Sequence, residues 1–221
     1  MWQGNALPQK WWAGMEAVHG DTLFLHEYPV PSMPDHRKIF AVDIMTGRLL
    51  WANEELAFSF AAGDRVYGSK DFFDRRAFFE LDIASGRECG EVSADRIRAL
   101  MSDLPVGWGP DVEFPAGADE VPLPAARFLE KTAGTLPGDT LRWGAVEVVT
   151  CFEAVPGPGP TPSMREHLFV IGKPVASTGA TLFHDVVCEG LSGPVPGTFF
   201  RVGKRVLYVR GRFTLRSLAI A

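Results

Sequence analysis

The sequence predicts an all-β fold built of repeated antiparallel units, and two observations support this prediction. A pattern of five residues occurs twice, with 39 positions between equivalent residues. The first copy is Phe40, Asp43, Ile44, Gly47 and Arg48, and the second is Phe79, Asp82, Ile83, Gly86 and Arg87. Short apolar runs also alternate with glycine-rich and proline-rich stretches, as in strands separated by turns. A fixed period of about forty residues is typical of repeat proteins, whose units bury their faces against one another.

Both copies of the pattern follow the same succession of elements. Gly20-Asp21 and Gly63-Asp64 each precede an apolar strand, and the pattern then supplies a hairpin. Asp and Thr or Ser side chains can bond backbone amides in its turn, where Gly accepts a positive φ. Each unit is therefore expected to form an antiparallel meander of the kind found in propeller blades. On this interpretation Asp43 and Asp82 are turn residues and not catalytic groups.

The first copy resembles the blade repeat of the pyrroloquinoline-quinone-type β-propellers. In that family an apolar pair, Asp, a Thr-Gly turn and a Trp recur in each blade, and Ala41-Val42-Asp43, Thr46-Gly47 and Trp51 match them. The second copy has Ser85 in place of the Thr and lacks the Trp. The resemblance covers roughly residues 10–92. It implies a small β-propeller-like repeat of about four to five antiparallel blades, within an uncharacterised bacterial family. It implies no quinone cofactor, because the dehydrogenases that bind one are much longer, and we expect no cofactor.

The repeat is interrupted in the middle of the chain, which predicts an insertion at about 93–140. Ser93–Met101 is expected to be a helix, because Ser93 can cap it and its apolar residues share one face. Prolines and acidic residues dominate 105–124, so regular strands are not expected there. A short second helix is expected at 125–131.

Strands are expected again in the second half, at 145–152 and 167–171, with a proline-rich loop between them. The stretch 181–190 is interpreted as a degraded third copy, with Asp185 in the turn position. The whole chain, 1–221, is expected to form a single domain.

The last unit lacks its turn and its final strand, and Gln9-Lys10-Trp11-Trp12 resembles that missing piece. Propellers commonly complete one blade from both ends of the chain, which removes an exposed sheet edge. We therefore expect such a closure here.

The composition excludes several classes of protein. Apolar side chains make up 46% of the chain, and no apolar stretch is long enough for a membrane helix. The first residues lack the apolar core of a secretory signal, so a cytoplasmic location is expected. The net charge of −5 disfavours nucleic acid as a partner. Three widely separated cysteines fit neither a disulfide framework nor a metal clamp. No membrane association is expected, and a monomer is the default.

Catalytic and metal-binding motifs are absent from the sequence. It contains no nucleophile elbow, phosphate-binding loop or dinucleotide fingerprint. The five histidines show no His-x-His or His-x-x-x-His spacing, so no metal site is expected. Asp35-His36 and His184-Asp185 are possible acid-base pairs, although neighbours in a strand point to opposite faces. Enzymatic activity is therefore disfavoured but left open.

Candidate binding residues lie where the repeat is broken. Trp108 and Phe114 occur beside Asp111 and Glu113, and aromatic anchors dominate binding hot spots. A second candidate surface is the basic end of the chain, which has six basic residues and no acidic residue after Leu191. Its candidate binding residues are Arg210 and Arg212.

The leading hypothesis is a small propeller-like binding or protein-interaction module for an unknown protein or small ligand. One alternative is an enzyme with its site in a central funnel. A second is a phosphate or nucleic-acid binder that uses the basic C-terminal strands.

Overall fold

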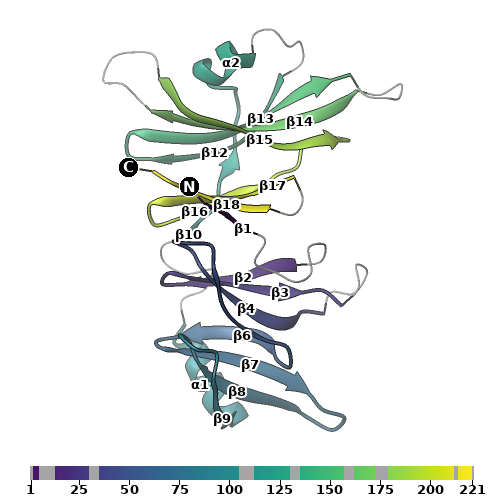
Figure 1. The fold of residues 1–221 in the computed structure, drawn as a ribbon, viewed down its shortest axis with the longest axis vertical. Coiled ribbons are helices and arrows are strands. Elements are labelled where there is room, and N and C mark those ends of the chain that lie inside the picture. Colours follow the sequence, from purple (N-terminus) through teal and green to yellow (C-terminus); the bar gives the residue numbers. More distant parts are fainter. Residues whose placement is uncertain are drawn as a thin grey trace. The chain divides into compact units, whose positions relative to one another are not determined.

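The computed structural model describes most of the chain (Figure 1). The described residues are 2–4, 13–29, 35–104, 112–129, 135–156, 162–172, 179–211 and 214–220. The chain divides into two compact units, Met1–Val112 and Glu113–Ala221. Four sheets of four or five strands account for most of the structure, which confirms the predicted all-β class of antiparallel, blade-like sheets.

Two four-stranded meanders form most of the first unit. Their strand orders are β2-β3-β4-β5 and β6-β7-β8-β9, with each strand antiparallel to its neighbour in sequence. The strands of this unit are β1 (Trp2–Gly4), β2 (Ala13–His19), β3 (Thr22–Glu27), β4 (Arg37–Asp43), β5 (Leu49–Asn53), β6 (Ala57–Ala62), β7 (Arg65–Asp71), β8 (Arg76–Asp82) and β9 (Glu88–Val92).

The turns of the two predicted hairpins have the same hydrogen bonds. Asp43 Oδ1 accepts bonds from the amide of Thr46 at 2.6 Å and from its hydroxyl at 2.9 Å. Asp82 Oδ1 accepts the equivalent bonds from Ser85, at 2.9 and 2.6 Å. The glycine that closes each turn has a positive φ, 72° in the first and 67° in the second. Asp43 and Asp82 are therefore turn residues, as their sequence context predicted.

The two meanders share an apolar core. Phe24, Ile39 and Trp51 from the first meander pack with Val66 and Leu81 from the second. Trp51 also donates a hydrogen bond from Nε1 to the carbonyl oxygen of Ile83 at 2.8 Å. This bond and the packing fasten one meander to the next.

The predicted helix follows the second meander as α1 (Ala94–Ser102). The hydroxyl oxygen of Ser93 caps it by accepting a hydrogen bond from the amide of Arg96. Ile97 is buried against Phe60 and Tyr67 on the face of this meander. The helix therefore covers a sheet face that would otherwise be open.

The second unit contains a larger sheet with the order β11-β12-β13-β14-β15, and three further antiparallel neighbours, β16, β17 and β18. β10 spans the boundary between the units. The elements are β10 (Val112–Glu113), β11 (Ala116–Gly117), α2 (Leu123–Leu129), β12 (Thr135–Trp143), β13 (Val146–Val155), β14 (Ser163–Gly172), β15 (Ala180–Leu191), β16 (Phe199–Val202), β17 (Arg205–Arg210) and β18 (Thr214–Ala219).

Both faces of the larger sheet are covered. On one face Val148 and Leu168 pack with Tyr208 of β17. On the other face Ala125 and Leu129 of α2 pack with Phe169. Residues 147–153 of β13 and 166–171 of β14 are buried without interruption, which agrees with a sheet that is covered on both faces.

Two stretches differ from the sequence prediction. Regular strands were not expected at 105–124, but the two-residue strands β10 and β11 lie there, because pairing with a longer strand needs only a short extended segment. The stretch 181–190 was expected to contain a turn at Asp185, but it lies within β15, which pairs with β14 along its length. Asp185 is paired with Leu168 in the ladder, and its carboxylate accepts a hydrogen bond from Tyr208 Oη at 2.7 Å. The pairing of β15 with the long strand β14 outweighs the local turn signal at Asp185. The stretch 9–12, which was predicted to complete the last blade, lies outside the described residues.

Candidate functional site

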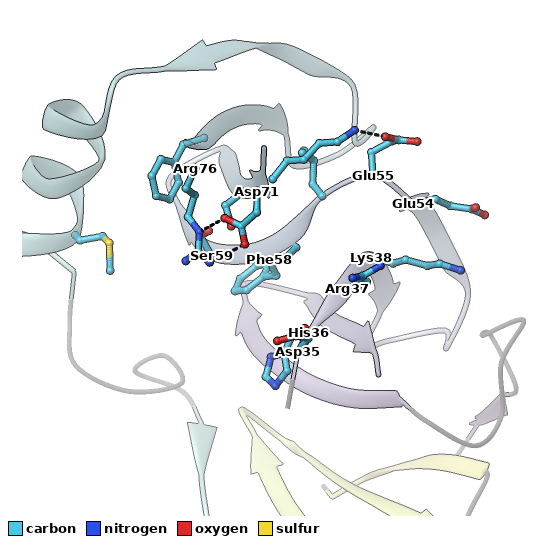
Figure 2. A pocket seen from close by; sticks show the side chains of 16 residues that line it. Asp35, His36, Arg37, Lys38, Glu54, Glu55, Phe58, Ser59, Asp71 and Arg76 are labelled. Carbon is cyan, nitrogen blue, oxygen red and sulfur yellow. Dashed lines mark hydrogen bonds and ion pairs between the residues drawn. The ribbon is translucent and has the colours of Figure 1, made fainter. Parts of the chain in front are cut away.

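The first unit contains a pocket of about 810 Å³. It lies at the starts of β4 and β8 and the end of β7, beside the segment that joins β5 to β6 (Figure 2). The basic residues of its lining are equal in number to the acidic ones. These residues are Arg37, Lys38, Lys70, Arg76, Asp35, Glu54, Glu55 and Asp71. The half-buried rings of Phe58 and Phe78 supply apolar surface.

Most of the basic groups in the pocket have an acidic partner. Arg76 donates two hydrogen bonds to Asp71, at 2.6 and 2.9 Å, and Lys70 bonds Glu55 (Figure 2). Lys38 is paired with Glu27 outside the pocket, at 2.9 Å. Arg37 is exposed and forms no ion pair with any residue that the structure describes. Its guanidinium is therefore open to an anionic group of a ligand.

The backbone at the rim of this pocket is strained. Lys38 has a φ of 63°. Among the described residues other than glycine, it alone has a positive φ. It lies in a β-bulge, because Leu25 pairs with Phe40 while Glu27 pairs with Arg37. Bulges and left-handed residues cluster where a strand must redirect a side chain, often beside functional sites.

Three ionisable side chains, from β2, from β3 and from the residue just before β4, meet near this rim. Glu16 Oε1 lies 2.8 Å from His36 Nδ1 and 2.9 Å from His26 Nδ1. The two imidazole rings are stacked with their centroids 3.7 Å apart, and the ring of Tyr28 meets both edge-on. Burial raises the pKa of Glu16, but the two histidines beside its carboxylate outweigh this effect and the net pKa is lowered. We refer to Glu16, His26 and His36 as the two-histidine cluster.

The register of β2 and β3 explains how these residues meet. Gly14 is paired with His26, and a Cβ atom at position 14 would lie 2.6 Å from His26 Nε2. The missing side chain leaves the space that the His26 ring fills. Glu16 is the extra residue of a second bulge, between the pairs formed by Met15 and Ala17. Neither feature follows from the spacing of the three residues in the sequence.

A second group of ionisable residues lies in the second unit. Glu153 Oε2 is 2.8 Å from His167 Nε2, and His167 Nδ1 is 2.9 Å from His184 Nε2. Desolvation by burial lowers the pKa of both histidines. The three groups form a linear chain of hydrogen bonds in which His167 uses both of its nitrogen atoms. The arrangement therefore suits proton transfer along the chain better than chelation of one ion.

The side chains of His184 and Asp185 lie on opposite faces of β15. The His184 ring contacts Phe128 of α2 and Phe169, with centroids 4.3 and 4.6 Å away. Asp185 instead bonds Tyr208 of β17 and Arg216 of β18, which belong to another sheet. This confirms that adjacent strand residues do not form an acid-base pair here.

The binding residues predicted from the sequence are not gathered into one site. Phe114 is 46% exposed and stacks against Phe200, with their ring centroids 5.8 Å apart. Glu113 accepts a hydrogen bond from Arg201 Nε at 3.1 Å. Arg210 Nε lies 3.4 Å from Asp185 Oδ1 and 3.2 Å from the carbonyl oxygen of Val186. Trp108, Asp111 and Arg212 lie outside the described residues.

Sequence reasoning missed the pocket and both histidine groups. Asp35-His36 was considered as an acid-base pair, but the partners of His36 come from β2 and β3. The available signal was that ionisable residues such as Glu16 and His26 interrupt otherwise apolar strands. Such residues in half-buried strands need a partner, but the sequence does not say which one.

The chain resembles a known protein family at its start and a solved structure over most of its length. Residues 1–51 match the model of a family described as Domain of unknown function (DUF4905). None of the curated proteins matches the chain. A crystal structure of TolB from Acinetobacter baumannii is similar at 12% identity and a TM-score of 0.23, over 90% of this chain and 51% of that one. The chain thus spans about half the length of that structure. Among the described residues, no helix is long and apolar enough to cross a membrane.

Proposed function

We propose that the chain is a binding module for a small molecule and that the pocket of the first unit is its binding site. The observation that supports this proposal is the pocket itself. Its volume of about 810 Å³ falls within the range of small-molecule sites, and its lining combines the rings of Phe58 and Phe78 with a larger number of charged and polar side chains.

The lining favours a zwitterionic ligand that has a flat apolar part. The fixed charges of the lining balance, so neither a strongly anionic nor a strongly cationic ligand is preferred. Arg37 can receive an anionic group, and Glu54 can receive a cationic one. The ring of Phe58 stacks on buried Phe24, with their centroids 5.1 Å apart, and is therefore held in place before a ligand arrives.

A polyanion-binding role for the basic end of the chain is less favoured. Arg201 is paired with Glu113, and both Arg210 and Arg216 lie against Asp185. Such internal pairing reduces the positive field that a phosphate backbone would meet.

Filling the pocket should abolish binding. Free aromatic amino acids are suitable probes, because they combine a zwitterion with a flat ring. In Ser59→Trp the new indole would occupy the pocket, and we expect saturation-transfer NMR signals of L-tryptophan and L-phenylalanine to disappear. In Arg37→Gln, which loses one charge-assisted bond, we expect binding to weaken by about tenfold.

Ser192→Trp is the matched control, because it places the same bulk at an exposed position of the second unit. It should bind the probes like the unchanged protein. Thermal melting of all three variants shows whether each is folded. Equal signals from folded Ser59→Trp and from the control, or no probe binding to the unchanged protein, would contradict the proposed site.

A further inference from the structure

His26 is a buried polar residue without the hydrogen bonds that such a residue requires. Its side chain is 1% exposed, and neither ring nitrogen has a hydrogen-bond partner among the described residues. The Nδ1 atom lies 2.9 Å from Glu16 Oε1, but not in the direction of a hydrogen bond. Buried polar groups in folded proteins are nearly always bonded, so an unbonded ring nitrogen that lies beside a carboxylate requires an explanation.

Two further potential ligand atoms lie close to this nitrogen. One nitrogen of His26, one nitrogen of His36 and one carboxylate oxygen of Glu16 all lie within 4.8 Å of one another. Two imidazoles and one carboxylate are the donor set of many zinc and other first-row transition-metal sites, which leave a further position for water. We propose that the two-histidine cluster is a binding site for a divalent first-row transition-metal ion, with Zn²⁺ as the reference case.

The distances fit such an ion after a small adjustment. Ligand atoms of a tetrahedral zinc site are about 3.3 Å apart, because each lies roughly 2.0–2.2 Å from the metal. The Glu16 oxygen is 2.8 and 2.9 Å from the two nitrogen atoms, so the cluster must open by about half an ångström. The stacked imidazole rings must also tilt apart. The side chain of His36 is 40% exposed and has room to make this movement.

The other side of the cluster is held rigidly. The His26 ring is confined by Gly14, where an added Cβ would lie 2.5 Å from Cε1, and by the edge-on ring of Tyr28. Glu16 lies at the bulge of β2, and its side chain is 13% exposed. The cluster thus has two largely buried ligands and one exposed, adjustable ligand. A bound ion would give His26 Nδ1 a bonding partner, and no other described group provides one.

This inference goes beyond the proposed function, because it does not require the pocket to bind a small molecule. His36 belongs to both the pocket lining and the two-histidine cluster. Binding of aromatic amino acids is therefore measured on metal-stripped protein, and metal binding is measured without them. Failure of one proposal is then distinguishable from failure of the other.

Cobalt and zinc titrations of the full chain test the site. Protein stripped with a chelator is titrated with Co²⁺, and the visible d–d bands are followed to saturation. We expect one equivalent to bind, with displacement of the bands by Zn²⁺. His36→Gln and Glu16→Gln should each weaken binding by at least about tenfold, since changes even to outer-sphere groups of metal sites cost that much. His36 is exposed, so His36→Gln should fold normally.

His184→Gln is the matched control, because it removes one histidine from the hydrogen-bonded chain of the second unit. It should retain the full cobalt spectrum and the unchanged affinity. The proposal is overturned if folded, unchanged protein produces no bands. It is also overturned if the bands persist unaltered in both His36→Gln and Glu16→Gln, or if they are lost in His184→Gln.

Discussion

Replacing Glu166 with glutamine is expected to stabilise the protein by about 3 kcal/mol at pH 8 and by almost nothing at pH 4. The side chain of Glu166 is 1% exposed. Burial, and to a smaller extent the negative charge of Asp139, raises its pKa from 4.5 to about 7, although a hydrogen bond from Thr198 opposes the shift. The ionised carboxylate is therefore less favourable in the folded state than in the unfolded chain.

The sign of this pH dependence follows from proton uptake. Between pH 4.5 and pH 7 the folded protein retains a proton on Glu166 that the unfolded chain has lost. The contribution of Glu166 to stability is thus complete below pH 4.5, decreases as the pH rises to about 7, and is constant above it. A glutamine can still accept the bond from Thr198, but it does not titrate.

Urea denaturation at pH 4, 6 and 8 measures the effect. The difference between Glu166→Gln and the unchanged protein should grow with pH. Glu120→Gln, at an exposed position of the same unit, is the control and should preserve the pH dependence of the unchanged protein. A stability difference that is the same at all three pH values would contradict the proposed titration of Glu166.

Trp51→Ala should destabilise the protein by about 4 kcal/mol, because it removes a large buried aromatic side chain. Trp51 is 8% exposed, packs with Phe24 and donates a hydrogen bond to the carbonyl of Ile83. Trp51→Phe keeps a ring in the core but leaves that carbonyl without its indole donor, and should cost about 1–3 kcal/mol. Equilibrium unfolding followed by far-ultraviolet circular dichroism measures both changes.

Leu50→Ala tests the specificity of this effect, because Leu50 is adjacent in the strand but 45% exposed. It should change the stability by less than about 1 kcal/mol. If Trp51→Ala costs no more than Leu50→Ala, Trp51 does not join the two meanders in the way the structure indicates.

The packing of Trp51 also explains a glycine of the repeat. A Cβ atom at Gly86 would lie 2.5 Å from the Trp51 ring, and Gly86 has a φ of 67°. This residue is therefore glycine for two reasons, the turn and the indole that lies on it. The sequence pattern indicated the first reason only. The second became visible once Trp51 of the first meander was seen against the turn of the second.

The amino-acid sequence by itself determined the local elements of this protein. The turns at Asp43 and Asp82 and the helix capped by Ser93 were all predicted, because each depends on residues close together in the chain. Turn hydrogen bonds, positive φ angles and helix caps involve neighbours within about four positions, so their signals are local.

Only the tertiary structure decided where the candidate sites lie. The two-histidine cluster depends on the pairing of β2 with β3 and on two bulges, and a shift of one residue would turn each side chain to the opposite face. The pocket collects residues from both meanders of the first unit. Asp185 is a further example. A local pattern predicted it in a turn, whereas strand pairing places it within β15. Strand register is set by contacts between distant residues, and a pattern read along one chain contains no direct record of it.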